Sequence, residues 1–150
     1  MAEVLFYHLT RRSLEQTLPI LVARTHERGQ RAVIRAGSDE RLRALDDLLW
    51  TFDEASFIPH GLAGEPGPEG QPVLLTTGDE RPNGAEVLFL VDGAPLPAAW
   101  DYARVVVLFD DADNEGRAIA RDQWRQVKAL GGHEATYWQQ DETGRWTRKA

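Results

Sequence analysis

Carboxylates gather in the last third of the chain, directly after its most strand-like segment. They are Asp110, Asp111, Asp113 and Glu115, with Asp122 further on. Counted from Asp111, carboxylates fall at positions one, three, five and twelve, which roughly imitates the calcium-binding loop of an EF-hand. Acidic residues at the carboxyl end of a strand are also typical of magnesium-dependent phosphatases. The cluster is therefore a candidate metal centre.

The surrounding sequence favours a structural role for this cluster. An EF-hand needs a helix before its loop, whereas residues 104–109 predict a strand. The phosphatase pattern needs a supporting lysine, and the chain has only Lys128 and Lys149. Carboxylates at a helix start cap the helix and favour its dipole. We therefore predict no metal or cofactor, and keep magnesium-dependent phosphoryl transfer by Asp110, Asp111 and Asp113 as an alternative function.

Other catalytic patterns are missing from the sequence. The first predicted strand is not followed by the glycine-rich turn of a dinucleotide site, and no phosphate-binding loop with a Gly-Lys pair occurs. The histidines at positions 8, 26, 60 and 133 lack the spacing of a zinc-binding helix. These patterns therefore lead us to expect no catalytic residue.

The last predicted helix carries a row of cations around a tryptophan. At about 100° per residue, Arg117, Arg121, Trp124, Arg125 and Lys128 fall on one stripe. The opposite side carries the apolar residues Ile119, Ala120, Val127 and Leu130. Arginines with an aromatic ring are typical of protein-binding hot spots, and arginines also bind carboxylates in bidentate fashion. On helix statistics alone, such a stripe is more often a solvated helix face with the tryptophan under arginine stems. The functional interpretation is a socket for an acidic peptide, and single-stranded DNA binding by the same residues is an alternative.

Periodicity predicts the scaffold that positions these residues. The predicted strands span residues 4–9, 31–36, 73–77, 86–91, 104–109, 134–139 and 145–148. The predicted helices run from Ser13 to Gly29, from Ser38 to Trp50 and over 114–130, with a short helical piece at 98–102 and an irregular stretch at 52–71. Ser13 with Gln16 predicts a capping box. This order predicts one α/β domain over residues 1–150, a three-layer α/β/α domain with a mostly parallel central sheet.

Composition limits the environment and the partners. The chain has 150 residues, no cysteine and a net charge of −7. The lack of cysteine suits a reducing compartment, and Glu3 near the start argues against a signal peptide. No apolar stretch reaches the roughly 20 residues of a membrane span. We therefore expect a cytoplasmic protein without membrane contact, and the acidic charge leads us to expect no direct nucleic-acid binding.

Several segments in order along the chain resemble the chi subunit of the bacterial DNA polymerase III holoenzyme. They are "FYHL" at the start, "ALDDLLWTFDEASFIPHGLAGEPGPEGQPV" over residues 44–73, "ARDQWRQVKALG" in the last helix and "TYW" after it. The resemblance implies a non-catalytic accessory subunit of the clamp-loader assembly in DNA replication. It also implies pairing with the psi subunit and binding of the acidic C-terminal tail of single-stranded DNA-binding protein, which ends in a phenylalanine.

The resemblance also implies roles for particular residues. Arg121 and Arg125 would meet carboxylates of the tail, with Lys128 beside them, and Trp124 would form a wall of its pocket. The central block would add Trp50 and Phe57 to the same apolar socket.

Overall fold

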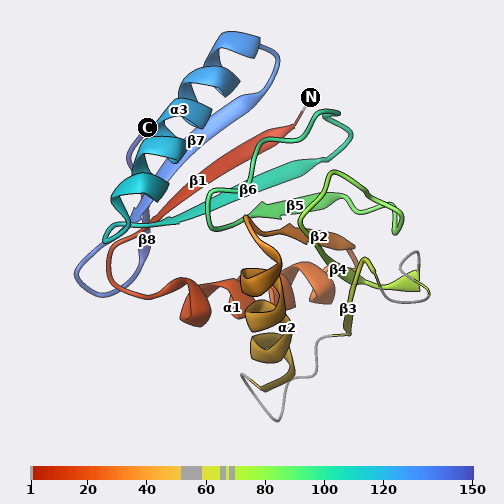
Figure 1. Cartoon of the computed structure of the whole chain (residues 1–150). Helices are drawn as coiled ribbons and strands as arrows, with labels where there is room; N and C mark the ends of the chain where they lie inside the picture. Colours follow the sequence, from red (N-terminus) through yellow and green to blue (C-terminus); the bar gives the residue numbers. More distant parts are fainter. Residues whose placement is uncertain (1, 52–58, 65–66, 68–69) are drawn as a thin grey trace.

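The computed structural model describes residues 2–51, 59–64, 67 and 70–150 (Figure 1). Within them, eight strands form one sheet and three helices pack on it. The strands are β1 (Glu3–Leu9), β2 (Ala32–Arg35), β3 (His60–Leu62), β4 (Val73–Thr76), β5 (Val87–Leu90), β6 (Arg104–Asp110), β7 (Glu134–Gln140) and β8 (Trp146–Arg148). The helices are α1 (Leu14–Glu27), α2 (Asp39–Thr51) and α3 (Asn114–Leu130).

The sheet has the order β3-β4-β2-β5-β6-β1-β7-β8. Every neighbouring pair is parallel except β7 and β8, which form an antiparallel hairpin. β1 lies between β6 and β7, with Phe6 beside Val107 on one side and Tyr137 on the other. The mostly parallel sheet confirms the fold class predicted from the sequence.

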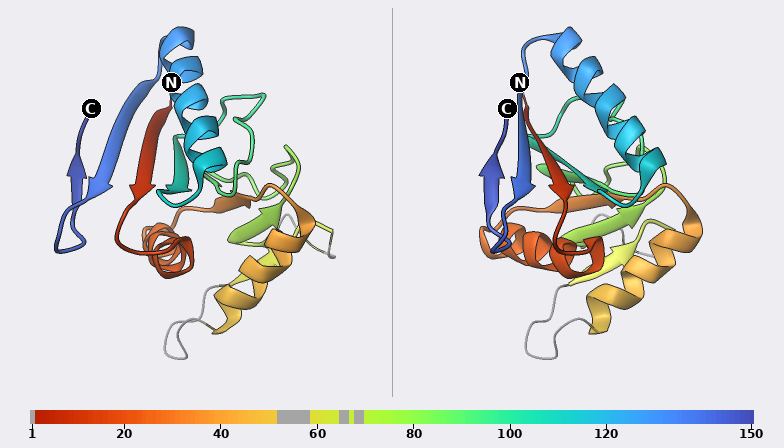
Figure 2. Two further views of the ribbon diagram at one scale, coloured as in Figure 1. Left: turned by 60° about the vertical axis from the view of Figure 1, so that its left-hand side comes forward. Right: turned by 90° about the vertical axis from the view of Figure 1, so that its left-hand side faces the viewer.

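The helices cover both faces of the sheet, which makes the domain three-layered. α1 and α2 lie on one face and α3 lies on the other (Figure 2). Parallel strands need crossover connections, and helices on both faces bury both sides of the strands. β2, β4 and β5 are accordingly buried along their whole length.

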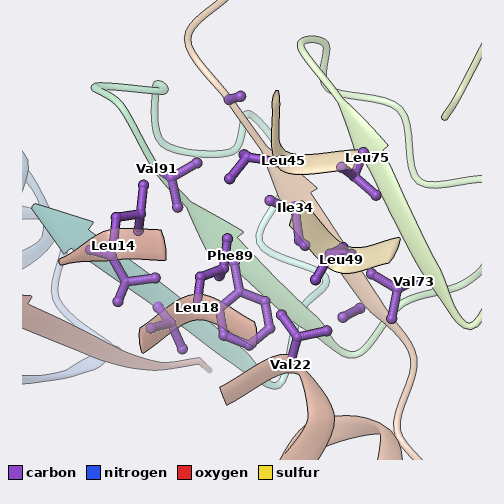
Figure 3. Packing of buried hydrophobic residues seen from close by; sticks show 14 of the residues in the cluster. Leu14, Leu18, Val22, Ile34, Leu45, Leu49, Val73, Leu75, Phe89 and Val91 are labelled. Carbon is purple, nitrogen blue, oxygen red and sulfur yellow. The ribbon is translucent and has the colours of Figure 1, made fainter. Parts of the chain in front are cut away.

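The core divides into two clusters, one on each face. Beneath α1 and α2, Leu14, Leu18 and Val22 point toward Phe89 of β5 (Figure 3). The second cluster lies beneath α3 and the segment 94–102, and contains Phe6 of β1. Alternation along each strand produces this division, because successive side chains point to opposite faces.

The helix ends follow the predicted capping chemistry. The Ser13 side chain accepts a hydrogen bond from the Gln16 amide, and the Gln16 side chain accepts one from the Ser13 amide, which confirms the capping box. At α3, Asp113 Oδ1 accepts from the Gly116 amide at 3.0 Å. α3 ends at Leu130 and is followed by Gly131, whose φ of 68° lies in the left-handed region that glycine adopts readily.

Three local predictions are wrong. Residues 98–102 form no helix, and β3 is a strand inside the stretch predicted to be irregular. Leu130, predicted to face the core, is 59% exposed, because it lies in the last turn of α3, beyond the part of the helix that is buried. No helix in the described part of the chain is long and apolar enough to span a bilayer.

Candidate protein-binding groove

A groove of about 400 Å³ runs between α3 and the strands β1, β6 and β7. We call it the α3 groove. Its lining residues are Phe6, His8, Phe109, Arg117, Ala120, Arg121, Trp124, Tyr137 and Ala150. The groove therefore combines aromatic rings with two guanidinium groups.

The sequence of α3 fixes which side chains reach this groove. Ala120, Gln123 and Val127 are buried against the sheet at helical spacing. Ala120 also forms part of the groove lining, because its small side chain leaves space between the helix and β1. Arg121 and Trp124 flank this buried row, so both border the groove.

Trp124 is half-buried and held by other aromatic rings. Its ring meets the edge of Phe6 with centroids 5.3 Å apart and that of Tyr137 at 6.3 Å. Lys128 Nζ lies 5.5 Å from the centre of the Trp124 ring, a cation–π contact. The ring is thus fixed in position and still lines the groove.

The cations of the α3 stripe differ in their pairing. Arg121, Arg125 and Lys128 are exposed, and no carboxylate of the described residues lies within ion-pair distance of them. Arg117 instead has its Nη1 3.8 Å from Asp111 Oδ1 and donates a hydrogen bond to Asn114. The three exposed cations are available for an anionic partner.

The floor of the groove contains a polar cluster that the sequence did not indicate. His8 is 8% exposed, with its Nε2 2.8 Å from Asp111 Oδ1 and its Nδ1 hydrogen-bonded to the Tyr137 hydroxyl. Its ring stacks on Phe109 with centroids 4.7 Å apart. Side chains alternate between the two faces of a strand, so the sequence alone could have indicated that His8 lies on the same face as Phe6. Tyr137 lies beside these residues only because β7 pairs with β1, and no local pattern in the sequence predicts that pairing.

Trp50 does not join this groove. It lies near the end of α2, on the opposite face of the sheet from α3, and is 55% exposed. Its ring lies 4.7 Å from the ring of His60. His60 is buried, with its Nε2 3.0 Å from Asp46 Oδ1. Trp50 and Trp124 therefore cannot contact one short peptide segment together. The predicted residue Phe57 lies outside the described residues.

The carboxylates at the end of β6 and directly after it each make a separate contact. Asp110 accepts a hydrogen bond from the Ala112 amide, Asp111 binds His8, and Asp113 caps α3. No group of three histidine or acidic side chains in the described ranges is arranged to hold a metal ion. The helix-capping role predicted for the cluster is confirmed at Asp113.

Comparison with known proteins identifies the family. The sequence model described as "DNA polymerase III chi subunit, HolC" matches residues 1–135. A probable DNA polymerase III subunit chi of Rickettsia prowazekii is 26% identical over 76% of this chain and 73% of its own length. The DNA polymerase III subunit chi of Escherichia coli is 25% identical over 79% and 81%, and that of Haemophilus influenzae is 23% identical over 87% and 93%.

The chain belongs to the DNA polymerase III chi subunit family. Chi is an accessory subunit of the replicative polymerase and not a catalytic one. The match ends at residue 135, so most of β7 and all of β8 lie beyond it.

Proposed function

We propose that this chi subunit binds the acidic C-terminal tail of single-stranded DNA-binding protein in the α3 groove and pairs with the psi subunit at another surface. One observation carries the first part: the exposed Arg121, which has no described acidic partner, lines the α3 groove beside the fixed Trp124. The exposed Arg125 and Lys128 lie on the same helix. An acidic tail would place carboxylates near Arg121 and Arg125, and its terminal phenylalanine side chain against Trp124. The protein would thereby link the clamp loader to coated template.

The test is a fluorescence anisotropy titration with a labelled acidic peptide ending in phenylalanine. Arg121→Ala should weaken binding about 10- to 100-fold, because a charge-assisted hydrogen bond contributes about 1.5–3 kcal/mol. Arg43→Ala is the matched control, since Arg43 is an exposed arginine on α2 and lies away from the groove. Equal affinity of the two variants would contradict the proposed site.

A second peptide separates carboxylate recognition from general attraction. A version with a C-terminal carboxamide should bind the unmodified protein more weakly than the free acid. If Arg121 recognises that carboxylate, the two peptides should bind Arg121→Ala with nearly the same affinity, as a double-mutant cycle requires. An undiminished difference in the variant would assign the carboxylate to another residue.

Trp50 is our candidate for the pairing with psi. It is one of the few large apolar side chains exposed in the described residues, and it belongs to α2, the helix on the face opposite α3. Exposed tryptophans are frequent in protein-binding hot spots. Trp50→Ala should weaken pairing with psi in a pull-down or calorimetric titration and leave the affinity for the tail peptide unchanged. Loss of peptide binding in this variant would place the tail on the α2 face instead.

A further inference from the structure

A second groove lies on the face of the sheet that carries α1. It consists of two adjoining cavities of about 280 Å³ and about 230 Å³, both lined by Leu21 and Arg24 of α1. β1 and β7 form part of the other wall, together with the hairpin that ends in β8. Figure 2 shows β7 and β8 extending beyond α1 at this edge of the sheet. We call this the α1 groove.

Arginines line the whole length of the α1 groove. The first cavity contains Arg28 and Arg104 in addition to the shared Arg24, and the second contains Arg12 and Arg145. Arg104 Nε lies 3.6 Å from Glu3 Oε1. For the other four arginines, no described carboxylate lies within ion-pair distance. A protein with a net charge of −7 therefore gathers five guanidinium groups in one place.

Aromatic rings lie between these cations. Tyr7 and Trp138 line the first cavity, and Trp146 lines the second. The Tyr7 and Trp146 rings pack with centroids 4.6 Å apart, and Tyr7 and Trp138 at 6.3 Å. The three rings come from neighbouring strands and are each partly exposed. Burial raises the pKa of Tyr7, and the positive charges of Arg104, Arg24 and Arg28 oppose that rise.

We propose that the α1 groove binds single-stranded nucleic acid, with arginines on the phosphates and bases against Trp138 and Trp146. Cations spread along a groove match the repeating charge of a phosphate backbone, and aromatic rings provide surfaces for unpaired bases. An acidic peptide would also place charges along the groove, but it would not supply a planar base for each of the exposed aromatic rings. From the acidic net charge we expected no nucleic-acid binding. A local cluster of arginines can nevertheless attract phosphates on a protein whose overall charge is negative.

The salt dependence of binding tests the charge pattern. A labelled oligothymidylate of about 15 nucleotides, a length within the site sizes of single-strand binders, is titrated with the intact protein, without partners, at about 50 and 200 mM salt. About four phosphate contacts to a single strand predict roughly a 50-fold loss of affinity between these concentrations. No detectable binding at the lower salt concentration would overturn the proposal.

Charge reversals locate the site. Arg24→Glu should weaken DNA binding about tenfold or more, because it replaces a contact shared by both cavities with a repulsive charge. Arg43→Glu changes the net charge equally, lies outside the groove on α2 and should change the affinity less than about twofold. Equal effects of the two variants would overturn the proposal.

Two further results would assign the binding sites differently. If Arg121→Glu and not Arg24→Glu abolishes DNA binding, the nucleic acid lies on α3 and the proposal is wrong. If Arg24→Glu abolishes binding of the phenylalanine-ended peptide, the α1 groove is a peptide site instead. Circular dichroism tests whether each variant is folded. Arg24 and Arg43 are exposed, so we expect their replacement to leave the fold intact.

Discussion

Removing the carboxylate of Asp79 should destabilise the fold markedly, because it would leave a buried charge with little compensation. Arg35 is 1% exposed, with its Nη2 2.6 Å from Asp79 Oδ1 and its Nη1 donating to the Pro95 carbonyl at 3.2 Å. Its Nε has no described hydrogen-bond partner. Asp79→Ala would leave one carbonyl group to balance a fully buried guanidinium.

The expected size of the effect comes from the exposure of the two partners. Breaking a buried ion pair costs about 3–5 kcal/mol, but the Asp79 side chain is 51% exposed, so water replaces part of the lost interaction. We expect about 2–3 kcal/mol, which lowers Tm by roughly 4–12 °C for a domain of this size. Thermal unfolding and urea unfolding followed by circular dichroism measure both quantities.

Two comparisons make this prediction refutable. Glu15→Ala removes a carboxylate 3.1 Å from the more exposed Arg41, and should cost no more than about 1 kcal/mol. In an Arg35→Met background, Asp79→Ala should cost far less, since no charge remains buried. The reasoning would be refuted by a similar loss of stability for Asp79→Ala and Glu15→Ala, or by an undiminished cost of Asp79→Ala in the Arg35→Met background.

Other properties of the fold can be tested separately. Gly116→Ala should lower the free energy of unfolding by about 1 kcal/mol in urea titrations, because its Cβ would lie 2.6 Å from Asp113 Oδ2 and disturb the helix cap. Hydrogen bonds, the strongest of them from the Thr143 side chain, lower the pKa of Asp141 in the folded protein. The ionised Asp141 therefore stabilises the fold fully at pH values above its unfolded-state pKa, and this contribution is lost as the pH falls through its folded-state pKa. Thr143→Ala should raise the pKa of Asp141 in an NMR titration. Burial raises the pKa of Tyr7 in the folded protein. The neutral Tyr7 therefore stabilises the fold fully at pH values below its unfolded-state pKa, and this contribution is lost as the pH rises through its folded-state pKa. Tyr7→Phe should remove a high-pH component from the ultraviolet titration of the tyrosines.

Local signals in the sequence predicted the elements well. The capping box at Ser13 and the cap at Asp113 depend on residues within one helical turn, so the sequence contains the whole interaction. β3 escaped prediction because His60–Leu62 has little β-forming character and gains its place by pairing with β4. Residues 98–102 have helical spacing but lie over the sheet as an irregular segment, an example of tertiary packing overriding local preference.

Long-range geometry limited the prediction of the site. The stripe on α3 was visible because helical period alone brings Arg121 and Trp124 together. The contribution of Tyr137 depends on parallel pairing of β1 with β7, which no local pattern specifies. The same limit explains Trp50, which was predicted to join Trp124 but lies on the other face. The sequence does not state which face of the sheet each helix covers.

The position of β1 has a consequence for how the chain acquires its fold. β2, β3, β4 and β5 come from one continuous part of the chain and are neighbours in the sheet. β1 is made first, yet it pairs only with β6 and β7, whose residues begin at Arg104 and Glu134. Such distant pairings are slow to form, because closing the long intervening segment costs entropy before the contacts can stabilise it. During synthesis, Val4, Leu5 and Phe6 therefore lack their native strand neighbours until β6 and β7 have been made, so β1 is translated before β2 to β8 and is among the last of them to be placed.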